Sequence, residues 1–402
     1  MNLWLRIFLP YAAGYVLSYL LRNANAVIAP ELTRELGISS SGLGLLTSAY
    51  LLAFGAFQLP LGILLDRYGP RRVESALLVV AASGSAFFAL GSTLPGLALA
   101  RAAIGLGVSA CLMGSFKVLS IWFPAERRPS LNAAVMVAGG LGALSATTPL
   151  SALLPALGWR GVFFALAALT LAAAFAIFLT PEKESAPSGE TFGEQIAALG
   201  SIVRSRPFRR YAPPTTMFVG GFMALQGLWA VSWIMHVNGS TREGAAFHLL
   251  LTTVAMTCGF LLVALFFGAL QRRGVRPDRM LAGGMAAGVL VLLGILLGAG
   301  CSHVLWFLLG LAFAVSNLSY ALLSAHFPPS LAGRANTALN LCVFAGAFLI
   351  QWGYGVSLDV LTARGWVMAD AHRAAVATLL ALQAASFAWF LATGRDHRSG
   401  QA

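Results

Sequence analysis

The chain has 402 residues, of which 58% are hydrophobic and 10% charged, and its mean hydropathy is +0.80. A soluble domain carries about 25% charged residues, so this composition excludes an ordinary soluble enzyme and indicates a membrane protein. The net charge of +12 is scattered in small groups between apolar runs, a pattern that favours membrane orientation over nucleic-acid binding.

Twelve apolar stretches are long enough to cross a membrane, for which a helix needs roughly 20 residues. They lie at residues 7–30, 43–65, 73–94, 96–122, 131–156, 161–180, 211–237, 246–270, 280–300, 304–327, 335–360 and 372–393. A closed β-barrel would need an alternation of polar and apolar residues that these stretches lack. The sequence therefore predicts an all-α membrane protein with twelve transmembrane helices, the first of which is retained rather than cleaved as a signal peptide.

Basic residues of the connecting segments gather on one side of the predicted membrane. Because the number of helices is even, both termini share a side, and most loop arginines lie there, including Arg6, Arg71, Arg209 and Arg272. Cytoplasmic loops carry an excess of Lys and Arg. We therefore expect both termini in the cytoplasm and a multi-pass chain in the cell inner, or plasma, membrane.

One long polar interval divides the chain into two halves of six predicted helices. We expect an N-terminal bundle at 1–180, a cytoplasmic linker at 181–210, a C-terminal bundle at 211–393 and a cytoplasmic tail at 394–402. Within the linker, residues 192–203 have the spacing of a helix that lies on the membrane surface. Identical residues recur at an offset of 206: Gly62 and Gly268, Arg128 and Arg334, and Gly140 and Gly346. Such duplication is typical of transporters that hold their site near the midplane, between the two halves.

A charged turn separates the second and third predicted helices and is too polar to lie in hydrocarbon. It reads Gly62-Ile-Leu-Leu-Asp66-Arg67-Tyr-Gly69-Pro-Arg71-Arg72. This segment resembles the loop signature of the major facilitator superfamily of secondary transporters, Gly-x-x-x-Asp-Arg-x-Gly-Arg-Arg, with Pro70 as its one departure. The resemblance implies that these residues form a gate, in which the carboxylate pairs across the two halves and stabilises one state of the transport cycle.

Other segments extend the resemblance over the whole chain. Arg101-Ala-Ala-Ile-Gly-Leu-Gly resembles the motif of the fourth helix of the superfamily. Tyr19-Leu-Leu-Arg22 resembles the branch of organic-anion and anion:cation symporters, which usually carries Tyr-x-Asp-Arg; Leu21 stands at the position of that aspartate. The resemblance implies two six-helix bundles, transport by alternating access, and a cavity lined by helices 1, 4, 7 and 10.

Arg22 lies deep in the first predicted helix, where a charge is expensive. A cation near the bilayer centre costs about 2.5 to 3.5 kcal/mol on insertion scales, so it should face a polar cavity or a partner. Tyr19 and Asn25 lie one turn away on the same face. We predict that this face binds a negatively charged substrate; the alternative is a structural arginine bonded to backbone carbonyls. No Asp or Glu is expected near the centre of a span.

Arg101 and Lys117 share the fourth predicted helix but point roughly 160° apart if the helix is regular. We expect Arg101 either to contact the substrate or the coupling network, or to be structural. Lys117 is expected to extend toward the cytoplasmic headgroups.

The second half offers uncharged polar and aromatic side chains at helical spacing. We expect them to bind the uncharged part of the substrate, or else to hydrogen-bond between packed helices. They are Gln226, Trp229, Trp233, Asn317, Tyr320 and Asn340.

The function expected from these features is secondary transport of a small, carboxylate-type organic anion by symport with H⁺ or Na⁺, or by exchange. A proton-coupled drug or metabolite exporter of the same superfamily is the first alternative. A copper or other metal importer, suggested by the Met and His residues of the seventh and eighth helices, and a non-transporting receptor are further ones. We expect a monomer without enzyme activity, cofactor, resident metal or nucleic-acid partner, and histidines such as His236 and His248 in interfacial roles.

Overall fold

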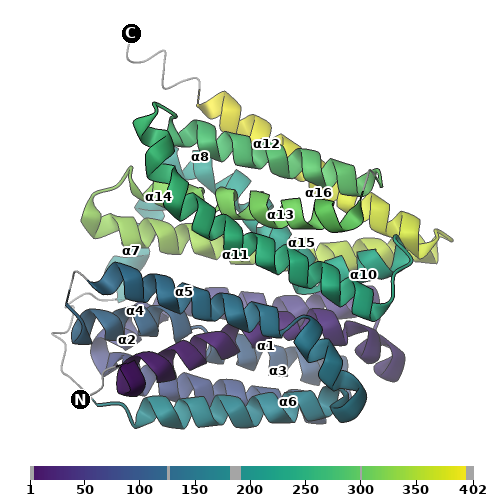
Figure 1. Cartoon of the computed structure of the whole chain (residues 1–402), viewed down its shortest axis with the longest axis horizontal. Helices are drawn as coiled ribbons and strands as arrows, with labels where there is room; N and C mark the ends of the chain where they lie inside the picture. The colour runs from purple at the N-terminus through teal and green to yellow at the C-terminus, as the bar shows by residue number, and fades with distance from the viewer. Residues whose placement is uncertain (1–3, 125–126, 182–191, 299–300, 395–402) are drawn as a thin grey trace. The chain divides into compact units, whose positions relative to one another are not determined.

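The computed structural model of the chain describes residues 4–124, 127–181, 192–298 and 301–394 (Figure 1). Within these residues the secondary structure is helical and contains no strand, as predicted. Ten helices are long and apolar enough to cross a membrane, counted over the same described residues. The all-α membrane class is therefore confirmed, while the number of twelve crossings and the side of the termini stay predictions.

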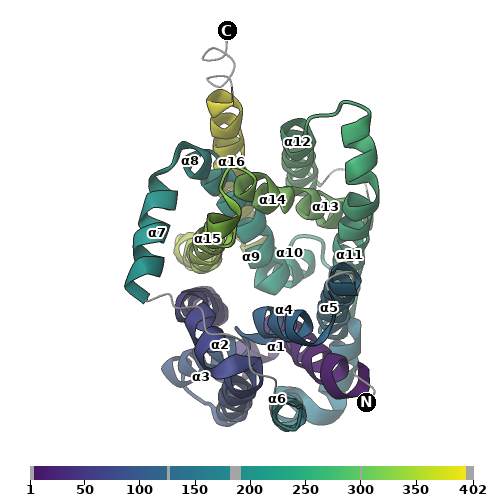
Figure 2. The same cartoon turned by 90° about the vertical axis from the view of Figure 1, so that its left-hand side faces the viewer.

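The chain forms two compact units, Met1–Phe192 and Gly193–Ala402. Figure 2 looks along the helix axes and shows that the helices of each unit run side by side as a bundle. Each unit is described by itself below.

The first unit begins with a short π-helical turn and continues with six helices. Their bounds are η1 (Trp4–Phe8), α1 (Leu9–Leu36), α2 (Ser40–Leu90), α3 (Leu94–Gly107), α4 (Cys111–Trp122), α5 (Arg128–Ser145) and α6 (Thr148–Phe178). Ser39 and Thr93 begin α2 and α3 because their hydroxyl oxygens accept the backbone N–H of Gly42 and Gly96. The long α2 is two arms joined at Gly69, whose φ of 76° is a left-handed conformation that favours glycine.

The first unit is held together by close packing of helix backbones. α2 packs along α3 and α6, and α1 packs along α5 and α6. At Gly105 of α3, a Cβ atom would collide with the carbonyl oxygen of Tyr50 on α2. At Gly142 of α5, it would collide with the carbonyl oxygen of Val16 on α1. Small residues that let helices approach this closely are characteristic of packing inside membranes.

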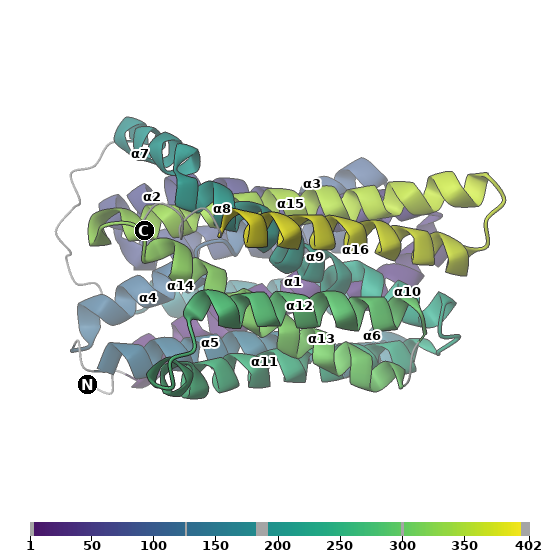
Figure 3. The ribbon, with the colours of Figure 1, turned by 90° about the horizontal axis from the view of Figure 1, so that it is seen from above.

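The second unit contains a first span that is interrupted by π-helical turns, followed by longer helices. The bounds are α7 (Phe192–Arg204), α8 (Arg206–Thr215), η3 (Thr216–Gly220), α9 (Gly221–Ala224), η4 (Leu225–Trp229), α10 (Ala230–His236), α11 (Arg242–Arg272), α12 (Pro277–Leu296), α13 (Ser302–Ser316), α14 (Leu318–Ser324), α15 (Pro329–Ala363) and α16 (Met368–Thr393). α8 to α10 together form one continuous apolar span, Arg206–His236. α7 coincides with the helix expected at 192–203 and lies at the edge of this unit (Figure 3).

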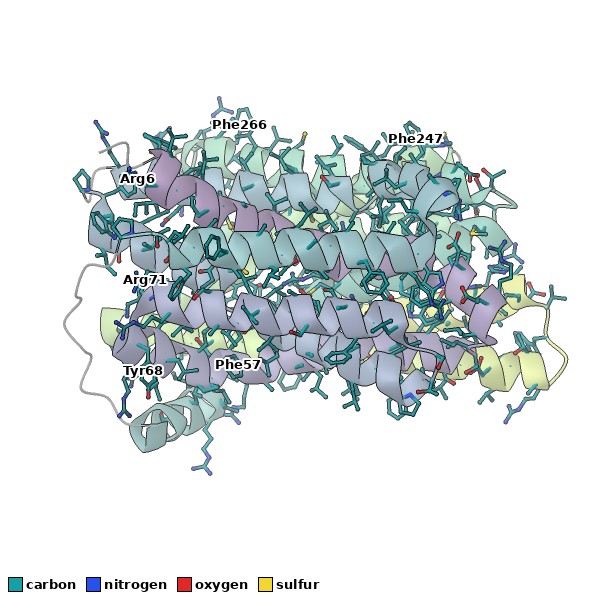
Figure 4. All side chains as sticks on the ribbon, turned by 90° about the horizontal axis from the view of Figure 1, so that it is seen from below. Arg6, Phe57, Tyr68, Arg71, Phe247 and Phe266 are labelled. Atoms are coloured by element: carbon teal, nitrogen blue, oxygen red, sulfur yellow. The ribbon has the colours of Figure 1, made fainter. Side chains whose placement is uncertain are left out.

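The core of the second unit lies where α8, α12, α14 and α15 meet. Tyr211, Met285, Leu323 and Leu339 are among its fully buried members. The outer faces are apolar too: Phe247 and Phe266, near opposite ends of α11, are 45% and 54% exposed and point outward (Figure 4). An apolar surface of this kind is what contact with lipid requires.

Candidate functional site

Arg22 lies on α1 among aromatic rings of α1 and α2. Its guanidinium carbon is 4.7 Å from the ring centre of Tyr19, 4.8 Å from that of Phe54 and 6.0 Å from that of Tyr50. The Arg22 side chain is half-buried, and Tyr50 is fully buried with its hydroxyl directed at the Ser18 carbonyl oxygen, 3.3 Å away. Aromatic faces attract a cation most strongly when it is partly desolvated, so this cage stabilises the charge of Arg22 inside the unit.

Arg101 of α3 lies next to the aromatic cage formed by Tyr19, Tyr50 and Phe54 around Arg22. It is fully buried, and its guanidinium donates to the carbonyl oxygen of Leu21 at 2.8 Å and to that of Arg22 at 3.4 Å. Its guanidinium carbon also lies 4.9 Å from the Tyr50 ring centre. The Arg101 side chain therefore fixes the α1 backbone at Arg22. This is the structural role expected from the sequence as the alternative to substrate contact for Arg101. Arg101 acts on Arg22 through the main chain.

The other polar residues on the Arg22 face of α1, Tyr15, Ser18 and Asn25, are directed at neighbours inside the first unit. Asn25 is fully buried and donates to the Thr47 hydroxyl of α2. The Tyr15 hydroxyl is directed at Met136 of α5, and Ser18 donates to a backbone carbonyl oxygen between α3 and α4. These three side chains thus turn to three different neighbours. Tyr19 and Arg22 are the residues of this face that stay half-exposed.

The charged turn at the bend of α2 contacts other helices of the first unit. Asp66 forms an ion pair with Lys117 of α4, so Lys117 does not simply extend toward lipid headgroups as expected. Arg71 donates to the carbonyl oxygens of Phe178 and Thr180 at 3.5 and 3.3 Å, at the end of α6. Arg6, Tyr68 and Arg71 lie at the same end of this unit (Figure 4). The remaining predicted gate residues, exposed or half-exposed, are Gly62, Arg67, Gly69 and Arg72.

Glu74 is a buried acid that sequence reasoning did not single out. It follows the bend of α2 by five residues, is fully buried, and packs against α1 and α4. In the sequence it is the second residue of the apolar stretch expected at 73–94, and in the structure Gly14 of α1 and Gly114 of α4 lie directly against its carboxyl group. The signal that could have found it is a lone acid inside the apolar stretch at 73–94.

A polar and aromatic cluster in the second unit surrounds His372 of α16, which sequence reasoning did not single out. Its ring nitrogens lie 2.9 Å from the Ser232 hydroxyl and 2.9 Å from the Tyr354 hydroxyl. Trp229 stacks on Tyr354 with ring centres 4.7 Å apart, and Trp233 meets His372 edge-on. Trp229 and Trp233 are each 1% exposed, so both pack inside the unit.

The other predicted binding residues of the second unit are half-buried and hydrogen-bonded. Gln226 donates to the Thr253 hydroxyl of α11 at 3.1 Å. Asn317, at the junction of α13 and α14, donates to the Phe313 carbonyl oxygen at 3.0 Å. Tyr320 donates to the Asn340 side chain at 3.0 Å. These contacts position the four side chains, and their part-exposed surfaces leave a role in binding open to test.

The metal-import alternative concerns the histidines of the second unit. The described residues contain no group of three or more His, Cys, Asp or Glu side chains that could hold an ion. His248 stacks on His303 with ring centres 3.8 Å apart, and its Nδ1 bonds to the Gly244 carbonyl oxygen at 2.8 Å. These two histidines thus take local roles at helix ends.

Comparison with known families identifies the class of the chain. The family model described as Major Facilitator Superfamily matches residues 11–351. The match covers most of both units and confirms the resemblance inferred from the charged turn.

Curated relatives are transporters of organic acids. The chain is 25% identical over 285 residues to the probable L-galactonate transporter of Escherichia coli (strain K12), covering 67% of this chain and 61% of that protein. It is 30% identical over 218 residues to the hexuronate transporter of the same strain, covering 50% of each. It is 32% identical over 158 residues to the galacturonate transporter of Dickeya chrysanthemi, covering 39% of this chain and 46% of that protein. The matches span less than two thirds of each relative's length.

Solved structures share the fold. The nucleoside transporter NupG aligns with a TM-score of 0.76 at 14% identity, covering 97% of this chain and 99% of that one. An inward-facing, occupied bacterial homologue of the human lysosomal transporter Spinster aligns with a TM-score of 0.75 at 16% identity, covering 97% and 96%. At these identities the likeness concerns the fold alone.

Proposed function

Because this chain belongs to the Major Facilitator Superfamily, we propose that it carries a small hydroxylated organic anion across the cell inner membrane. As a multi-pass member of a transporter family it is a transport protein rather than an enzyme, as predicted. Galactonate, hexuronate and galacturonate, named for its relatives, each combine one carboxylate with several hydroxyl groups. A substrate of this class needs a cation for its charge and neutral polar groups for its hydroxyls.

The observation that carries the proposal is the aromatic cage of Arg22. Three rings and the backbone bonds of Arg101 hold this guanidinium in a half-buried position. Away from bulk water, a pair between a guanidinium and a carboxylate is stronger and can be bidentate. We assign Arg22 as the anchor of the substrate carboxylate and Tyr19 as its neighbour in the site, with Arg101 and Asn25 as residues that position α1.

Neutral side chains of the second unit are the proposed partners of the substrate hydroxyls. Gln226, Asn317, Tyr320 and Asn340 each carry amide or hydroxyl groups at half-buried positions. Amides and hydroxyls both donate and accept, which matches the hydrogen-bonding character of a polyol. We assign Trp229 and Trp233 to the walls that support this set, because they pack around His372.

The transport cycle proposed is alternating access with twelve crossings and cytoplasmic termini. The bend at Gly69 divides α2 into two arms, and α5 adds a shorter apolar helix to the ten long ones. The turn that contains Asp66 and Arg71 is the proposed gate between the two bundles, 1–180 and 211–393. A monomer that exchanges anions, or carries them together with H⁺ or Na⁺, would suffice for this cycle.

The test is binding and exchange of labelled galacturonate by purified protein in liposomes. Arg22→Ala should weaken binding by about 100-fold, since losing a charge-assisted pair costs roughly 3 kcal/mol. Arg6→Ala serves as the matched control, because Arg6 is an exposed arginine of the same unit. Unchanged affinity in Arg22→Ala would refute the anchor role. Lack of exchange of any hydroxylated acid by the unaltered chain would refute the proposed substrate class.

A further inference from the structure

The Glu74 carboxyl group lies between Gly14 of α1 and Gly114 of α4 in the first unit. The side chain is 0% exposed. A Cβ atom at Gly14 of α1 would lie 3.1 Å from its Oε1, and one at Gly114 of α4 would overlap its Oε2. Within the described part of the chain, neither carboxyl oxygen has a hydrogen-bond partner. Both helices thus leave room for this acid but provide it with no donor.

The side chains around this carboxyl group are mostly apolar. Ile177 of α6 and Leu78 of α2 approach the same Gly14 face, at 3.5 and 3.6 Å from its ideal Cβ. The titratable group that faces it from α4 is the Cys111 thiol, and on α1 the Tyr15 hydroxyl turns away toward α5. A carboxylate without a partner in such surroundings is strongly disfavoured relative to the neutral acid.

Charged groups lie between this acid and the end of the bundle that carries the charged turn. Lys117 follows Gly114 by three residues on α4 and therefore lies on the same helix face, one turn further along. It is paired with Asp66, and the two side chains are 19% and 33% exposed. Arg71, on the same arm as Glu74, is bound to carbonyl oxygens at the end of α6. This partly exposed ion pair therefore involves the same face of α4 as Gly114, which contacts the carboxyl group.

We propose that Glu74 is the proton-binding site that couples proton movement to transport of the organic anion. The inference rests on the proposed function, because it requires an anion bound at Arg22. The carboxylate takes up one proton when the anion is bound and releases that proton after the anion leaves, so one O–H bond forms and breaks in each cycle. The net result is movement of one proton with each anion.

The physical link between the two sites is electrostatic. Gly14, which contacts Glu74, precedes Arg22 by eight residues of α1, or about 12 Å of helix. At that distance and an effective dielectric constant of about 20, opposite unit charges attract enough to change a binding constant about tenfold. An anion that neutralises Arg22 removes this attraction, and the Glu74 carboxylate then binds a proton more tightly. By reciprocity, the protonated chain binds the anion more tightly.

The decisive experiment compares the unaltered chain with Glu74→Gln in liposomes. Gln has the shape of the neutral acid and cannot lose a proton. We expect galacturonate counterflow, which needs no net proton movement, to stay within about twofold, while accumulation driven by a pH gradient falls at least tenfold. Asp370→Asn, a change at an exposed acid paired with Arg373 on α16, should leave both activities unchanged.

A second measurement detects protonation of the carboxyl group directly and does not depend on transport. Infrared difference spectra of the unaltered chain, recorded with and without galacturonate at a pH at which the unliganded chain has lost the Glu74 proton, should show the C=O stretch of a newly protonated carboxyl group, absent in Glu74→Gln. Gradient-driven accumulation that persists in Glu74→Gln, or the absence of this band while galacturonate binds, would overturn the inference. Coupling lost in His372→Gln and kept in Glu74→Gln would overturn it as well. Failure of the proposed function would instead appear as a lack of galacturonate binding by the unaltered chain.

Discussion

Replacing Arg101 tests which of two roles this residue has: positioning the Arg22 anchor or contacting the substrate itself. Its guanidinium makes two charge-assisted bonds to the carbonyl oxygens of Leu21 and Arg22 and lies over the Tyr50 ring. Such bonds contribute about 1.5 to 3 kcal/mol each and the ring about 1 to 2 kcal/mol. Burying the cation at membrane depth costs about 2.5 to 3.5 kcal/mol in return. We therefore expect Arg101→Ala to lose roughly 2 to 4 kcal/mol of stability.

The assay is thermal unfolding of the purified variants in one detergent, combined with transport kinetics. Arg101→Ala should lower the melting temperature and reduce the maximal rate. Arg101→Lys should recover part of the stability, because one ammonium group reaches fewer acceptors than a guanidinium fork. Arg373→Ala is the control, since its pair with Asp370 is surface-exposed and worth about 0.5 kcal/mol. An Arg101→Ala variant of normal stability whose KM alone rises would show that Arg101 contacts the substrate.

Two further experiments test the packing and the ion pair of the first unit. Gly105→Ala should destabilise the first unit by about 1 to 3 kcal/mol, because its Cβ atom would collide with the Tyr50 backbone. Gly283→Ala, inside α12 with nothing within 4 Å of the new Cβ atom, is the control and should leave stability unchanged or raise it by up to about 1 kcal/mol in the same melting assay. Asp66→Asn should lower the stability of the chain, and adding Lys117→Met to that variant should restore part of it, because the unpaired ammonium group is then removed. A double-mutant cycle should give a coupling energy of about 1 kcal/mol between the two residues. Strictly additive effects of the two substitutions would contradict the ion pair.

The spans were predictable because length and apolarity belong to each helix by itself. The stretch expected at 372–393 corresponds to α16, and the one at 280–300 overlaps α12. The charged turn and the Arg22 face were likewise local patterns. What failed was the assumption that the fourth span is one regular helix. Its regular structure is interrupted at residues 108–110, so Arg101 and Lys117 belong to different helices.

The partners of the buried charges were not predictable in the same way. Glu74 and Asp66 are close in sequence, yet one is sealed between α1 and α4 while the other meets Lys117. The difference depends on which helices pack beside each arm of α2 and how far they extend. That information comes from long-range packing, which periodicity within one helix does not contain.

The two π-helical turns in Arg206–His236 determine which side chains of this span face inward. Each π-helical turn holds one residue more than an α-helical turn. The side chains that follow it are therefore rotated about the helix axis by about 100° relative to a uniform α-helix. Loss of a single residue at either turn would rotate the next segment as a whole. A different set of side chains would then face inward from the same stretch, while the helices packed around it kept their sequences.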